Sequence, residues 1–103
     1  MNLIDITKLN SQLRYTIDYY GVNNQLRKLQ EEIDEFKKEV YLYENGIGNI
    51  VNIIDEYADV VNVLTQFKLH YKIDDKKLIP RRIYKSNRTY ERTSEGYYDK
   101  KNS

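Results

Sequence analysis

The sequence predicts an all-α protein built as a four-helix bundle. Apolar residues recur at spacings of three and four along most of the chain, which is the period of an amphipathic helix. No alternating strand with a hairpin turn interrupts this pattern, and short stretches rich in Gly, Asn and Asp divide the chain into four helical segments. We expect residues 1–93 to form a single domain and residues 94–103 to form a flexible tail, because the last stretch has little to bury.

The first two helices are predicted to meet at a glycine. The apolar stripe of the first helix ends at Tyr20, and Gly21 provides a stop signal. We expect Asn23 or Asn24 to cap the second helix, which ends at "ENGIGN". The second helix carries one apolar stripe, made of Leu26, Leu29, Ile33, Phe36 and Val40.

The third helix is predicted from about Ile50 to Tyr71 and is apolar around most of its circumference. Such a helix is usually central and buried. One stripe consists of Ile50, Ile54, Ala58, Val61 and Leu64, and a second consists of Ile53, Val60, Val63 and Phe67.

The fourth helix is expected to follow a loop, "KIDDKKLIP". Pro80 suits the first turn of a helix, where its missing N–H costs nothing, and the helical pattern continues to about Thr93.

Acidic residues crowd the middle of the second helix in "KLQEEIDEF" (residues 28–36). At 100° per residue, Glu32 and Glu35 flank the apolar stripe, whereas Glu31 and Asp34 point to the opposite side. Pairs of this kind are also common on solvated helix surfaces, and that interpretation stays open for Glu32 and Glu35.

The third helix carries a second acidic pair in a less ordinary setting. Glu56 points among apolar residues and Asp59 lies at their edge. A carboxylate in such a place is costly unless it is neutralised, paired or bound to a metal, and no Lys or Arg shares that face of the helix. If the second and third helices pack antiparallel, both acidic pairs converge, and an all-oxygen site of this type suits Mg²⁺ or Mn²⁺.

These residues resemble the MazG-like, all-α nucleoside triphosphate pyrophosphohydrolases, a group related to the dimeric dUTPases. The family signature is E-E-x-x-E, a spacer with a loop, and then E-x-x-D. Here it is matched by "EEIDE" (residues 31–35) and "EYAD" (residues 56–59), and the resemblance covers roughly Tyr20 to Arg92.

The resemblance implies a MazG-like helical bundle and a Mg²⁺-dependent reaction in which Mn²⁺ is a substitute. A nucleoside triphosphate would be cleaved between its α and β phosphates to a monophosphate and pyrophosphate, for control or cleansing of nucleotide pools. The implied metal ligands are Glu32, Glu35, Glu56 and Asp59. Glu31 is implied as the flanking catalytic carboxylate that orients or activates water.

A basic stripe on the fourth helix is a candidate for binding the substrate phosphates. Lys85, Arg88 and Arg92 fall on one face together with Arg81, and "YKSNRTYER" is similar to phage-type members of the family. A solvated basic face or a patch that contacts RNA explains the same stripe equally well.

Composition excludes several other classes of function. The net charge of +1 makes nucleic acid an unlikely partner overall, and the absence of cysteine excludes disulfides and thiolate chemistry. We expect a cytoplasmic protein with no signal peptide or membrane span, acting as a homodimer or homotetramer. The alternative to an enzyme is a non-catalytic helical module that binds a nucleotide, RNA or a protein partner on the same scaffold.

Overall fold

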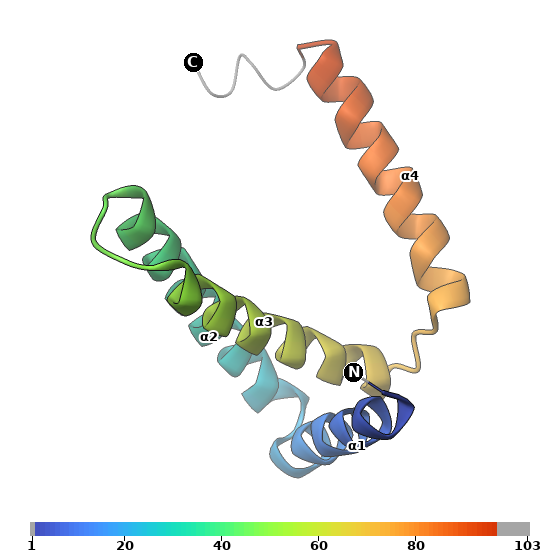
Figure 1. Ribbon diagram of the computed structural model, residues 1–103. Helices are drawn as coiled ribbons and strands as arrows, with labels where there is room; N and C mark the ends of the chain where they lie inside the picture. The colour runs from blue at the N-terminus through green and yellow to red at the C-terminus, as the bar shows by residue number, and fades with distance from the viewer. Residues whose placement is uncertain (1, 97–103) are drawn as a thin grey trace. The chain divides into compact units, whose positions relative to one another are not determined.

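The computed structural model describes residues 2–96, and in this range the chain forms four helices and no strand (Figure 1). The prediction of an all-α fold is therefore confirmed. None of these helices has the combination of length and apolar character that a membrane crossing requires. The helices are α1 (Leu3–Tyr20), α2 (Val22–Glu44), α3 (Ile50–His70) and α4 (Asp75–Ser94).

The chain divides into two compact units, Met1–Lys72 and Ile73–Ser103, and each is described by itself. The single domain expected over residues 1–93 thus stays a prediction. Of the tail expected from residue 94, residues 97–103 lie outside the described part of the chain.

The first unit is built around α3. Helices α2 and α3 lie side by side and antiparallel, and α1 packs against α3 as well (Figure 1). Leu13 and Ile17, four residues apart on α1, are buried together with Val63 of α3. Full burial of such a side chain stabilises the fold by about 1.5–3 kcal/mol. This small core holds α1 against the central helix.

A single residue, Gly21, joins α1 to α2. Its φ of 84° and ψ of 160° belong to a region that residues with a Cβ rarely adopt. The Gly21 N–H donates to the Ile17 carbonyl at 2.8 Å, and the Gly21 carbonyl accepts from the Gln25 N–H at 3.1 Å. Gly21 therefore ends one helix and begins the next, so the expectation that Asn23 or Asn24 caps α2 is wrong: both lie inside its first turn.

The loop between α2 and α3 is closed by the backbone of Leu42. Its carbonyl accepts hydrogen bonds from the N–H groups of Ile47 (3.0 Å) and Gly48 (3.2 Å). A Cβ at Gly48 would lie 3.1 Å from the Tyr43 nitrogen, so a side chain there would crowd the turn. Asn49 then caps α3 by accepting from the Asn52 N–H at 3.0 Å. The tight turn fixes which residues of the two helices lie opposite one another.

The start of α4 differs from the prediction. Asp74 accepts a hydrogen bond from the Lys77 N–H at 3.0 Å, so the helix begins at Asp75 and includes most of the expected loop. Pro80 consequently lies inside the helix rather than in its first turn. An interior proline lacks the N–H that would bond the carbonyl four residues earlier, here that of Lys76. The aspartate cap is a stronger start signal than the position of the proline.

The central position of α3 is as predicted, but its burial is not. The stripe that contains Val63 is packed or partly packed, because α1 and α2 both cover that side. The other stripe is largely exposed, and its exposed members are Ile50, Ile54, Ala58, Val61 and Leu64.

Candidate metal centre

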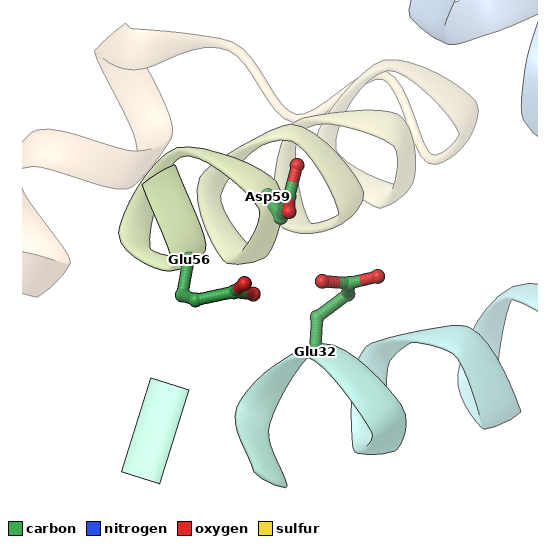
Figure 2. A group of neighbouring side chains, drawn as sticks. All are labelled: Glu32, Glu56 and Asp59. Atoms are coloured by element: carbon green, nitrogen blue, oxygen red, sulfur yellow. The ribbon is translucent and has the colours of Figure 1, made fainter. Parts of the chain in front are cut away.

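Three carboxylates from the two antiparallel helices come together in the first unit. Glu32 of α2 and Glu56 and Asp59 of α3 each offer one oxygen, and these oxygens all lie within 4.8 Å of one another. Figure 2 shows the carboxyl groups of Glu32 and Glu56 facing each other across the space between the helices, with Asp59 one turn along α3. Oxygen ligands of a single Mg²⁺ are at most about 4.2 Å apart. The group is therefore only slightly wider than a bound ion requires.

The close approach of these carboxyl groups changes the pKa of Glu56. Its partly covered position on α3 raises the pKa of its carboxyl group through desolvation, and the nearby charge of Asp59 raises the pKa further. The charges of Glu32, Glu35 and Glu39 act in the same direction. In the absence of a cation, Glu56 thus resists ionisation.

Asp59 is affected in a similar way. Desolvation raises the pKa of its carboxyl group, and the charge of Glu32 and a hydrogen bond with that side chain raise it further. Glu32 itself is nearly enclosed, with 9% of its surface exposed. Carboxylates that are held this close at neutral pH favour a bound cation, because the cation removes their mutual repulsion.

Glu39 provides a separate indication that the site suits a cation. Its Oε2 atom is buried and has no hydrogen-bond partner among the described residues. Its charge is close enough to Glu56 to raise the pKa of that residue. A buried carboxyl oxygen without a partner is costly, and a divalent ion nearby would offset the cost. The sequence places Glu39 one turn beyond Glu35 on the same side of α2.

One basic residue that the sequence analysis missed lies within the acidic group. The Lys28 ammonium is 3.0 Å from Glu32 Oε1 and 3.8 Å from Glu31 Oε2. The hydrogen bond with Glu32 raises the pKa of Lys28. The expectation that no basic residue lies near Glu56 and Asp59 holds for their own helix only. The positive charge of Lys28 on α2 acts to lower the pKa of Asp59. Lys28 and Glu32 are four residues apart, and this spacing on a helix predicts an ion pair between them.

Replacing Lys28 by methionine is expected to tighten the binding of Mn²⁺ about three- to fivefold. The ammonium competes with a metal for Glu32, but the Lys28 side chain is half exposed and an exposed ion pair is worth up to about 1 kcal/mol. Isothermal titration calorimetry with Mn²⁺ measures the change. Lys37→Met, also exposed on α2, is the matched control. An unchanged or weaker affinity in Lys28→Met would show that Lys28 does not compete with the metal.

A cavity of about 650 Å³ begins beside the acidic group and extends between α1, α2 and α3. Asp59 and Glu32 line one part of it, together with the basic side chains of Arg27 and Lys28. Cavities of about 300–1,000 Å³ are typical of small-molecule sites. The two basic residues are candidate phosphate contacts that the sequence analysis did not identify.

The remaining acids of the predicted site are placed less closely. Glu35 is outside the group of three oxygens, although its charge raises the pKa of Glu56 and so places it nearby. Glu31 lines the cavity, and its side chain is 70% exposed. The predicted roles of Glu35 as a metal ligand and of Glu31 as a catalytic residue that orients or activates water stay predictions.

The predicted phosphate-binding residues lie in the second unit, on α4. Lys85, Arg88 and Arg92 belong to Ile73–Ser103, so their contact with a substrate stays a prediction. Within that unit, Arg88 and Arg81 both lie over the ring of Tyr84, at 6.0 and 5.0 Å from its centroid. These contacts place Arg81 and Arg88 near one another, and the wider basic stripe stays a prediction.

Comparison of the chain with models of protein families, with curated proteins and with solved structures found no match. The resemblance to the MazG-like enzymes therefore rests on the residues of this chain alone.

Proposed function

We propose that this protein is a Mg²⁺-dependent nucleoside triphosphate pyrophosphohydrolase of the MazG-like type. The observation that carries the proposal is the meeting of Glu32, Glu56 and Asp59 between two antiparallel helices, at the edge of a cavity of ligand size. The spacing of these acids in the chain is that of the family signature. Within the cavity wall, Arg27 and Lys28 add the positive charge that a polyphosphate requires.

In the proposed reaction, water adds to the α-phosphorus and the bond to the bridging oxygen of the β-phosphate breaks, so that pyrophosphate leaves. Mg²⁺ would neutralise phosphate charge and lower the pKa of a bound water. Glu32, Glu56 and Asp59 would hold the ion, and Glu35 would complete the set that the motif predicts. Glu31, exposed beside Lys28, would accept the proton that the attacking water loses.

An oligomer is also part of the proposal. A large part of the apolar surface of α3 is exposed, including Ile50, Ile54 and Leu64, each about half exposed. A second copy that covered this stripe would remove it from water. A homodimer or homotetramer thus remains our expectation.

A turnover assay tests the proposal directly. Purified protein is incubated with canonical and modified NTPs and dNTPs in Mg²⁺ or Mn²⁺, and monophosphate and pyrophosphate are measured. We expect equal amounts of the two products, and none in EDTA. Orthophosphate as the product would contradict cleavage at the α-phosphate. No turnover with any nucleotide, although calorimetry shows bound Mn²⁺, would favour the non-catalytic binding module.

A further inference from the structure

Two buried amide side chains face each other between α2 and α3. Gln25 and Gln66 are each only 5% exposed, and Gln25 Nε2 donates to Gln66 Oε1 at 2.7 Å. Among the described residues, this is the one side-chain hydrogen bond shown for Gln25 and for Gln66. A carboxamide has two N–H donors and an oxygen that accepts twice. The bond therefore leaves the oxygen of Gln25 and the NH₂ group of Gln66 without a further partner among the described residues, and neither atom is among those fully shielded from solvent without a partner.

Both amides line the same cavity as Glu32 and Asp59 of the acidic group. Glu32 follows Gln25 by seven residues on α2, and Asp59 precedes Gln66 by seven residues on α3. Seven residues are close to two helical turns, so the amide pair lies about 10 Å along the helices from the carboxylates. This separation is comparable with the length of a sugar and its first phosphate.

The cavity wall near the amides is partly apolar. Leu13 and Val63, two residues of the buried core, both line it. A ligand at this end would therefore meet an apolar surface and a neighbouring donor and acceptor. Planar heterocycles with an adjacent N–H and carbonyl or ring nitrogen match this combination, and nucleobases are the heterocycles that carry phosphates.

We infer that Gln25 and Gln66 form the subsite that recognises the nucleobase of the substrate. The inference rests on the proposed function, because it assigns the phosphates to the acidic end of the same cavity. The Gln25 oxygen accepts from a donor on the base, and the Gln66 NH₂ group donates to a neighbouring acceptor. A site built to hydrogen-bond one ligand rejects an analogue that leaves its buried polar groups unpaired. The amide pair thus determines which base is preferred.

The test compares wild type with the double variant Gln25→Met/Gln66→Met. Replacement of both partners by apolar groups of similar shape leaves no buried amide unpaired, so the fold should tolerate it. Affinities for dAMP, dCMP, dGMP and dUMP are measured by calorimetry in Mn²⁺. In wild type, we expect the dissociation constants of the tightest and the weakest monophosphate to differ at least tenfold. In the double variant, we expect them to differ less than threefold. Gln30→Met, an exposed position on α2, is the control that should keep the wild-type spread.

A second variant covers the case in which the double variant does not fold, which circular dichroism would show. Gln66→Glu replaces the NH₂ donor by an acceptor and is expected to change which monophosphate binds tightest. A wild-type spread below threefold would overturn the inference, as would a folded double variant with the wild-type spread or a Gln66→Glu variant with the wild-type order. Turnover is scored separately. Selective binding without turnover would reject the hydrolase and keep the base subsite. Turnover at equal rates for all bases would keep the hydrolase and reject the base subsite.

Discussion

Glu56→Gln is expected to lower kcat/KM for the preferred nucleotide by at least about a hundredfold. The substitution keeps the size of the side chain and removes one of the three charges that converge on the candidate metal centre. Loss of a group that merely orients a metal ligand typically costs about 10–100-fold in metal affinity or activity. Loss of a ligand itself should cost at least as much. Initial rates of pyrophosphate release over a range of Mg²⁺ concentrations measure the effect.

The matched control is Glu44→Gln, an exposed acid at the end of α2. It should leave turnover within about twofold of wild type, since exposed substitutions away from a site have small effects. Glu35→Gln adds a test of the motif. A loss as large as that of Glu56→Gln is expected if Glu35 completes the ligand set, as the motif predicts. Wild-type turnover in Glu56→Gln would exclude Glu56 as a metal ligand in catalysis.

The helices and the meeting of the acids could be predicted from local rules. Periodicity and turn residues gave the four helices, and Asn49 and Asp74 cap two of them as such residues commonly do. The convergence of Glu32 with Glu56 and Asp59 needed only two further assumptions, an antiparallel hairpin and 100° per residue. The start predicted for α4 from Pro80 was wrong because Asp74, six residues earlier, caps the helix.

What the sequence did not predict depends on contacts between helices. The ion pair of Lys28 with Glu32 lies within α2 and follows the ordinary spacing of four, but the effect of Lys28 on Asp59 of α3 depends on how the two helices pack. The facing of Gln25 and Gln66 requires the register between the two helices, which the turn after Glu44 sets. The exposure of one stripe of α3 could not follow from that stripe's own composition. It depends on which side α1 and α2 cover.

Mn²⁺ at a hundredfold excess over its dissociation constant is expected to raise the melting temperature at pH 7 by about 10 °C or more. Binding to the folded state alone stabilises it by about 2.7 kcal/mol at that excess. In a domain of this size, 1 kcal/mol corresponds to roughly 4–8 °C. Thermal unfolding followed by circular dichroism, in Mn²⁺ and in EDTA, measures the shift. An equal melting temperature in the two conditions would mean that the acidic group holds no metal.

The pH dependence of this shift has a definite sign. In the metal-free protein, desolvation and neighbouring carboxylates raise the pKa values of Glu56 and Asp59. At a pH above the ordinary pKa values of these groups, the folded state therefore binds more protons than the unfolded chain. When the folded state binds more protons, the free energy of unfolding falls as pH rises. These two groups therefore stabilise the metal-free protein fully below their ordinary pKa values, and that contribution is lost as pH rises through the raised values. Protons also compete with Mn²⁺ for the same oxygens. The difference between the melting temperatures in Mn²⁺ and in EDTA should consequently grow from pH 5 to pH 7.

Glu56→Gln separates this effect from the titration of other groups. The amide cannot ionise, so the metal-free variant should melt higher than wild type at pH 7 and more nearly equal to it at pH 5. The same variant should respond little to Mn²⁺, because one of the three converging charges is gone. Glu44→Gln should behave as wild type in both conditions. A Glu56→Gln variant less stable than wild type at pH 7 in EDTA would mean that Glu56 stabilises the metal-free fold. The acidic group would then be a structural feature rather than a site whose repulsion a cation relieves.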